Sequence, residues 1–146
     1  MSLKNWLKNG WLKPHKTSKQ EIGNLFKIVD RDLGDAQRKD VSPDWRFGIA
    51  YNAALKLCTI LLYCEGYKSE NTYAHYRTIQ SLPLILGNDR SNDAAYLEAC
   101  RIKRNIVEYD YAGSTSDSEA DELIGFVKKL YAEVSEWVVK DHSGDV

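Results

Sequence analysis

The stretch SPDWRFGIAYNAALKLCTILLYCEG, residues 42–66, decides the fold. It opens with Ser42, a good acceptor for the free N–H groups of a first helical turn, and Pro43 follows at a position where its missing N–H costs nothing. Gly66 is a typical helix-terminating residue. In between, apolar residues recur every three or four positions: Trp45, Ile49, Ala53, Leu57, Ile60, Leu61 and Cys64. Residues 60–63 make the helix apolar nearly all round, which predicts that it lies in the centre of a helical bundle.

Apolar spacing on both sides of this stretch predicts further helices. A Ser-x-x-Glu capping box at residues 18–21 opens one that weakens at Gly34. Its apolar face carries Ile22, Leu25, Phe26, Val29 and Leu33. A third helix covers about 70–82 and is broken by Pro83, and a fourth follows a cap at 91–93 and runs towards Tyr109.

The last helix opens with a second capping box, Ser116-x-x-Glu119. Its predicted buried face carries Leu123, Phe126, Val127, Leu130, Val134 and Trp137. The tail, residues 141–146, is expected to fray. We find no strand pattern and predict an all-α chain, a four- to five-helix up-and-down bundle.

Composition is that of one folded domain spanning residues 1–146, with 43% hydrophobic and 28% charged residues. The longest apolar run without charge, residues 57–64, is far short of the roughly 20 residues that a membrane-spanning helix needs. The first residues lack the apolar core of a secretion signal. We therefore expect a cytoplasmic protein without membrane association. The odd number of cysteines, Cys58, Cys64 and Cys100, shows no C-x-x-C spacing and predicts reduced, buried packing residues.

Charge is concentrated at the start of the chain. Residues 1–19 contain five lysines and no acid, so they carry +5 of a net charge of −1 and leave −6 for the rest. Residues 1–16 form a basic amphipathic segment. Its apolar residues are Leu3, Trp6, Leu7, Trp11 and Leu12. Docking on its own bundle is the simplest interpretation, and a partner, a membrane surface or nucleic acid are the alternatives.

The stretch YLEACRIKRNIVEYDY, residues 96–111, carries the most chemistry. On a helix it has two apolar faces, which indicates either a central position or contact with a second subunit. One face contains Leu97, Cys100, Arg104, Val107 and Tyr111, and the other Ile102, Ile106 and Tyr109. A guanidinium among apolar neighbours needs a carboxylate, a bound anion or a wet cleft. A structural pair between Arg104 and Glu108 is therefore the alternative to an anion-binding role.

The chain here resembles the HEPN superfamily of helical bundles, many of which are dimeric ribonucleases of toxin and defence systems. Arg104 and the polar Asn105 match the start of the family motif, and Tyr111 matches a tyrosine found in toxins paired with a nucleotidyltransferase antitoxin. Residues 45–68 look like the long central helix of the family, and residues 75–86 look like the helix that follows it. The motif histidine is absent, because positions 109, 110 and 111 are Tyr, Asp and Tyr.

The resemblance implies a homodimer that meets along the Arg104 helix, with RNA as a ligand and an antitoxin or nucleotidyltransferase as a further partner. Arg104 would stabilise the phosphate, Asn105 would orient it, and Tyr109 would replace the histidine. Arg101, Lys103 and Tyr111 would contact nucleic acid. A HEPN-fold dimerisation or ligand-binding module without catalysis is the competing hypothesis, and the near-neutral net charge argues against tight nonspecific nucleic-acid binding.

Other features of the sequence predict less. His15, His75 and His142 lack the spacing of metal ligands, so we expect neither a metal nor a cofactor. His75 is the only one of them inside a predicted element. It could supply an imidazole if it faces Arg104, although a histidine at the surface or the edge of the core is the simpler interpretation. Four tyrosines around one helix end could stack bases, although core packing is the simpler explanation. They are Tyr63, Tyr67, Tyr73 and Tyr76.

Overall fold

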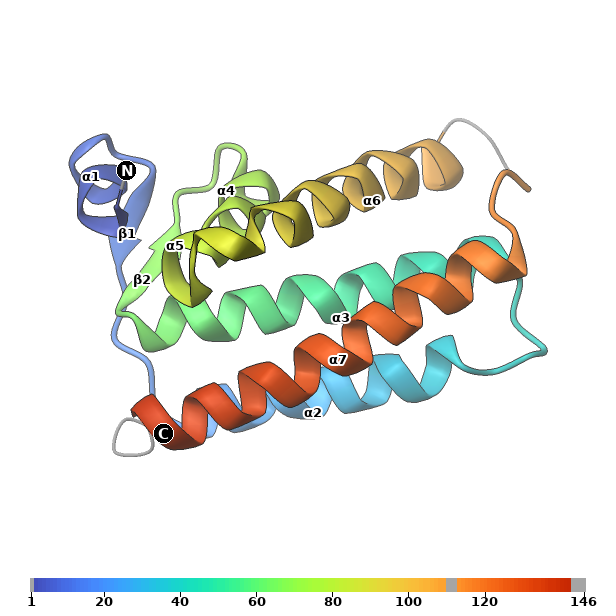
Figure 1. Cartoon of the computed structure of the whole chain (residues 1–146), viewed down its shortest axis with the longest axis horizontal. Coiled ribbons are helices and arrows are strands. Elements are labelled where there is room, and N and C mark those ends of the chain that lie inside the picture. The colour runs from blue at the N-terminus through green and yellow to red at the C-terminus, as the bar shows by residue number, and fades with distance from the viewer. Residues whose placement is uncertain (1, 110–112, 143–146) are drawn as a thin grey trace.

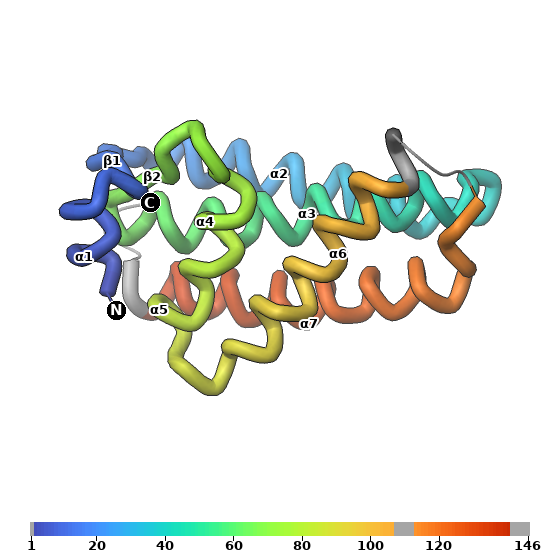
Figure 2. The backbone as a smooth tube through the Cα atoms, turned by 90° about the horizontal axis from the view of Figure 1, so that it is seen from above, coloured from blue at the N-terminus to red at the C-terminus, as the bar shows by residue number. Residues whose placement is uncertain are grey.

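The computed structural model describes residues 2–109 and 113–142, with side chains for 2–106 and 113–140. The chain is predominantly helical, which confirms the all-α prediction. Its centre is α3 (Pro43–Cys64), and three other long helices pack against it. They are α2 (Lys19–Ala36), α6 (Ser91–Tyr109) and α7 (Asp117–His142). Figure 1 shows α6 along one side of α3 and α2 and α7 along the other, and Figure 2 shows that α2 and α7 are separated in depth.

The ends of α2 and α3 follow from their sequence. Ser18 caps α2 by accepting a hydrogen bond from the backbone N–H of Glu21 (3.1 Å), and Ser42 caps α3 in the same way from Trp45 (3.3 Å). The predicted capping box of α2 is only half formed, because the Glu21 carboxylate turns to His15 instead of back to Ser18. At the far end of α3, Gly66 takes a positive φ of 93°, where a glycine is unstrained.

The first turn of α3 is rotated relative to the prediction. Trp45 was expected inside, but 61% of it is exposed, and Arg46 is buried instead. The guanidinium of Arg46 donates to the carbonyl of Ala36 (2.8 Å) and reaches Asp117 and Asp121 at the start of α7. A buried cation is tolerated here because it pairs with polar groups from two helix ends, the end of α2 and the start of α7.

The segment after α3 differs most from the prediction. Instead of one helix over 70–82, the structure has a strand, β2 (Tyr67–Ser69), followed by α4 (Ala74–Gln80) and α5 (Leu82–Leu86). Pro83 opens α5 rather than ending a helix, since an N–H is not needed at a first helical turn. The prediction of no strand is also wrong, because β2 pairs antiparallel with β1 (Leu12–Pro14). Strands of three residues are too short to show an alternating pattern.

The last two long helices have nearly the predicted bounds. The predicted cap at 91–93 is wrong, because a 3₁₀ turn at Asn88–Arg90 runs directly into α6, which begins at Ser91, and the Ser91 hydroxyl donates to the carbonyl of Asn88. The capping box of α7 is confirmed in both directions between Ser116 and Glu119. α7 runs to His142, two residues into the tail that we expected to fray, and residues 143–146 lie outside the described part of the chain.

The basic N-terminal segment docks on its own molecule, the first of the alternatives above. A short helix, α1 (Leu3–Lys8), precedes β1. Trp6 and Leu12 are buried together with Leu62 of α3. Burial of these two large apolar side chains contributes roughly 1.5–3 kcal/mol each to docking, and the pairing of β1 with β2 also holds the segment in place.

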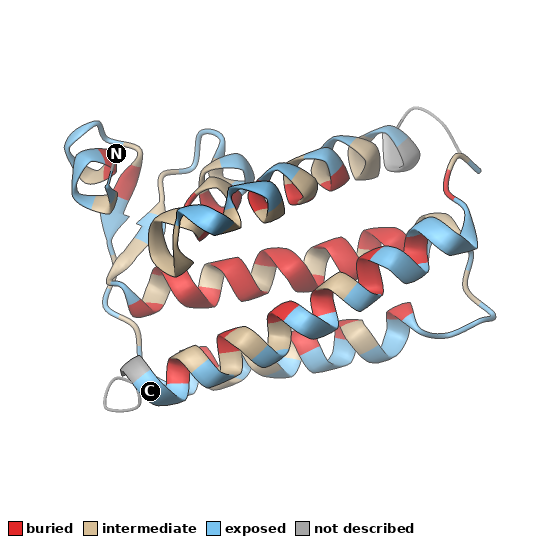
Figure 3. Ribbon diagram, in the orientation of Figure 1, coloured by how far each residue is buried: buried red, intermediate tan, exposed pale blue. Residues whose placement is uncertain are grey.

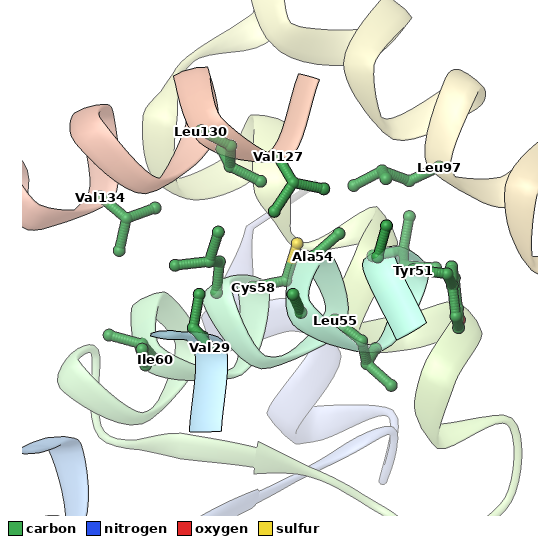
Figure 4. Close-up of a cluster of buried hydrophobic side chains, with 14 of the residues drawn as sticks. Val29, Tyr51, Ala54, Leu55, Cys58, Ile60, Leu97, Val127, Leu130 and Val134 are labelled. Carbon is green, nitrogen blue, oxygen red and sulfur yellow. The ribbon is translucent and has the colours of Figure 1, made fainter. Parts of the chain in front are cut away.

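The core lies along α3. Figure 3 shows α3 buried along nearly its whole length, whereas α6 and α7 are buried mainly on the sides that face it. In the close-up of Figure 4, side chains of α2, α6 and α7 converge on α3 around Cys58. All three cysteines are buried and free, as predicted. Among the described residues, α3 is the one helix long and apolar enough to cross a membrane, a property that it shares with core helices of soluble proteins.

Candidate nucleic-acid interface

An open groove of about 650 Å³ lies between α4 and α6. The turn before α4 and α4 itself form one wall, and the first half of α6 forms the other. Its lining includes Tyr73, His75, Tyr76, Arg77, Glu98 and Arg101. The groove therefore combines an imidazole, two guanidinium groups and two phenol rings, with a single carboxylate among the described lining residues.

Beside this groove, the ring of Tyr51 on α3 connects α4 with α6. The His75 ring lies 6.4 Å from the Tyr51 ring, centroid to centroid. The guanidinium carbon of Arg104 lies 5.6 Å from the same centroid, within the range of a cation–π contact. The structure thus brings together two residues 29 positions apart in sequence, His75 and Arg104, through a ring that is 1% exposed.

The charges of this cluster act on its titratable groups. Partial burial of the imidazole and, after it, the positive charges of Arg104, Lys56 and Arg101 lower the pKa of His75 below its usual value. The imidazole is therefore neutral at pH 7 and able to accept a proton. Burial raises the pKa of the Tyr51 phenol, while the charges of Arg101 and Arg104 act in the opposite direction. We call His75, Arg101, Arg104 and Tyr51 the histidine cluster.

Arg101 is held in place by its own helix. Glu98, one turn earlier, accepts hydrogen bonds from Nε (2.7 Å) and Nη2 (2.9 Å) of Arg101. This bidentate pairing raises the pKa of Arg101 and fixes its direction towards the groove. Of the guanidinium nitrogens, Nη1 forms none of these bonds and can donate to a ligand in the groove.

The opposite wall of the groove is aromatic. Tyr73 is 71% exposed and adopts a positive φ of 58°, and Tyr76 is 38% exposed. A bulky residue in the left-handed region is uncommon, and such conformations are concentrated at functional sites. Arg77 is fixed between two rings, 3.7 Å above Trp11 of the N-terminal segment and 5.8 Å from Tyr76.

Of the residues predicted to act at the site, Arg104 and Arg101 lie in this cluster. Leu97 and Cys100, which share the predicted stripe with Arg104, are buried, and Arg104 is half-buried. Asn105 accepts a long hydrogen bond from Arg104 (3.5 Å).

Lys103 lies on the opposite side of α6. Its ammonium pairs with Glu119 of α7 (2.9 Å) and donates to the carbonyl of Ser114. These two contacts attach α7 to α6 and explain the position of the Lys103 side chain, which does not line the groove. The side chains of Glu108 and Tyr109, and all of Tyr111, lie outside the described residues, so the predicted Arg104 pair with Glu108 does too.

The four tyrosines divide into two groups. Tyr73 and Tyr76 lie in the groove, whereas Tyr63 stacks on His15 (4.2 Å) and Tyr67 packs against the N-terminal segment. In the described part of the chain, no group of three or more His, Cys, Asp or Glu side chains is arranged to hold a metal ion.

Sequence reasoning missed Tyr51 and the position of His75. Tyr51 follows the core pattern of α3 and has no local sign of a functional role. The rest of α4, all of α5, a 3₁₀ turn and most of α6 separate His75 from Arg104 in sequence, and the packing of α4 and α6 on α3 places both near Tyr51. Comparison with protein-family models, with curated proteins and with solved structures finds no match to this chain.

Proposed function

We propose that the protein binds single-stranded RNA in the groove between α4 and α6 and cleaves it without a metal ion, with His75 in place of the histidine missing from the HEPN motif. The observation that supports this is the histidine cluster, in which a neutral imidazole and the Arg104 guanidinium both lie near the Tyr51 ring and the charges of Arg104 and Arg101 act on the imidazole. Exposed tyrosines on the other wall offer surfaces on which unpaired bases can stack.

The chemistry needs a base, a proton donor and stabilisation of negative charge. His75 takes the proton of a ribose 2′-hydroxyl, whose oxygen attacks the adjacent phosphorus. Arg101 and Arg104 stabilise the charge that develops on the phosphorane oxygens. The bond to the 5′ oxygen breaks, a 2′,3′-cyclic phosphate forms, and the leaving oxygen takes a proton from solvent or from Tyr109.

We further propose the finer architecture that the resemblance implies, a four- to five-helix up-and-down HEPN bundle that forms a homodimer through α6. Ile102 is 49% exposed and Ile106 is 41% exposed, one turn apart on that helix. Both are on the side that α3 does not cover, so a second α6 can bury them. A cytoplasmic toxin, stress or defence role with an antitoxin or nucleotidyltransferase partner belongs to the same proposal.

The test is cleavage of a fluorescent single-stranded RNA in the presence of EDTA. We expect the wild-type protein to yield fragments that end in 2′,3′-cyclic phosphate. Arg104→Met and His75→Gln should each slow cleavage by about 100-fold or more, the usual contribution of a general base or of one charge-stabilising donor. Arg38→Met is the matched control, because Arg38 is exposed and pairs only locally with Asp40.

Wild-type protein that neither binds nor cleaves RNA would contradict the proposal. So would equal activity of Arg38→Met and Arg104→Met. Sedimentation of the wild-type protein as a monomer at micromolar concentration would contradict the dimer.

The competing proposal is a HEPN-fold module that binds RNA or another ligand without catalysis. It is favoured by the bidentate pairing of Arg101 with Glu98, which neutralises part of the charge that catalysis needs. Binding of RNA that is weakened by Arg104→Met, with no cleavage by the wild-type protein, would support this alternative.

A further inference from the structure

A second groove, of about 450 Å³, continues from the first. The two share Asn71, Ala74 and His75 in their linings, so His75 lies where they meet. The second groove runs between the β1–β2 ribbon, α3 and α4. Three lysines line it, each from a different element: Lys13 from β1, Lys56 from α3 and Lys68 from β2. We call this the lysine groove.

Two of the three lysines face each other across the ribbon. Lys13 and Lys68 are register partners in the antiparallel pair, and both are exposed. Like charges directly opposite each other on neighbouring strands are destabilising. An arrangement that works against the fold is expected where a ligand of the opposite charge compensates for it.

The described lining residues of the lysine groove include no carboxylate. Among the ion pairs between the described side chains, those of residues 2–106 and 113–140, none involves Lys13, Lys56 or Lys68.

Glu21, on which the charge of Lys68 acts, is already engaged elsewhere. Glu21 accepts hydrogen bonds from Thr17 (2.7 Å) and His15 (2.7 Å). Burial raises the pKa of Glu21, but these two bonds and the charges of His15 and Lys68 together outweigh it and hold the pKa below its usual value. The carboxylate is thus directed to the N-terminal segment rather than into the groove.

We propose that the lysine groove is a second phosphate subsite, which holds a backbone phosphate of the same RNA strand whose neighbouring phosphate lies at the histidine cluster. This rests on the proposed function and adds to it the class of substrate: an extended single strand of several nucleotides. It also assigns a role to the basic N-terminal segment. Docking of Trp6 and Leu12 on Leu62 holds β1 in place, and β1 carries Lys13 into the groove.

The experiment compares two probes, the dinucleoside monophosphate UpU and a fluorescent single-stranded hexauridylate. UpU has one phosphate and reaches only the histidine cluster, whereas the hexamer reaches both subsites. Binding is measured with the Arg104→Met and His75→Gln variants as well as the wild type, over a range of salt concentrations.

The test variant is the double substitution Lys13→Gln/Lys68→Gln. The control is Lys4→Gln/Lys8→Gln, which removes the same charge from exposed positions of α1 that line neither groove.

We expect the test variant to bind UpU like the wild type and to bind the hexamer with a shallower salt dependence. Each lost phosphate contact on a single strand lowers the slope of log affinity against log salt by about 0.7, so loss of the one phosphate held in the lysine groove gives a change of about 0.7. The control should keep the wild-type slope. The melting temperature of the test variant should equal or exceed that of the wild type, because a like-charge pair has been removed.

Failure of this inference and failure of the proposed function give different results. If the wild type binds hexamer and Arg104→Met weakens that binding, but the test variant matches the control, the second subsite is refuted while the function stands. Competition by a 16-base-pair RNA duplex as strong as that by the hexamer refutes the single-strand substrate. If the wild type binds neither probe, both proposals are overturned.

Discussion

The hydroxyl of Tyr51 is buried and has no hydrogen-bond partner among the described residues. The whole side chain is 1% exposed, so water does not reach it easily. A buried polar group without a partner lowers stability, because unfolding returns it to water. We therefore expect Tyr51→Phe to make the protein more stable, which is unusual for a substitution in the middle of a core helix.

The magnitude follows from the surroundings of the ring. An unpaired buried hydroxyl costs about 1–3 kcal/mol. Phenylalanine keeps the ring that contacts His75 and Arg104, so the packing changes little. We expect the free energy of unfolding to rise by about 1 kcal/mol, and the melting temperature by about 3 °C for a chain of this length.

Urea and thermal unfolding followed by circular dichroism provide the assay, and Tyr96→Phe is the matched control. The Tyr96 hydroxyl hydrogen-bonds with Cys100 and Glu122, so its removal should lower the free energy of unfolding by about 1 kcal/mol. The two substitutions remove the same atom and should change stability in opposite directions. If Tyr51→Phe destabilises the protein as much as Tyr96→Phe, the Tyr51 hydroxyl has a partner and the reasoning is wrong.

Three further outcomes are expected. Arg46→Met should lower the free energy of unfolding by about 1.5–3 kcal/mol, because methionine keeps the apolar stem but leaves the Ala36 carbonyl without its charged donor. A loss under about 0.5 kcal/mol in urea unfolding would refute this. NMR titration should place the pKa of His75 below 6.5, and Arg104→Met should raise it. The folded protein lowers the pKa of His75, so the stability that depends on a neutral imidazole is present above the unfolded-state pKa and is lost as pH falls through the folded-state pKa. The wild type should therefore lose more stability than His75→Gln between pH 7 and pH 5. Ser116→Ala should cost about 1 kcal/mol and increase hydrogen exchange in the first turn of α7.

The histidine cluster shows which residues of the candidate site could be predicted from the sequence and which could not. Arg104 was identified because a guanidinium within an apolar stripe is expensive, and the structure places it, half-buried, against the ring of Tyr51. The same reasoning could not predict that His75 lies near Arg104, because nothing in the residues around His75 indicates what its side chain faces. The lysine groove could not be predicted either, because its three lysines come from positions 13, 56 and 68 and meet through a ribbon of two three-residue strands.

The sequence by itself determined the long helices, because their signals are local: caps at Ser18, Ser42 and Ser116 and an apolar repeat of three and four residues. Tertiary structure decided whether an end residue such as Trp45 or Arg46 turned inward, since that depends on Asp117 and Asp121 about 70 positions later. It also decided which charges stand together in the two grooves. Local periodicity specifies which side of a helix is apolar, but the identity of its neighbours is set only when the whole chain packs.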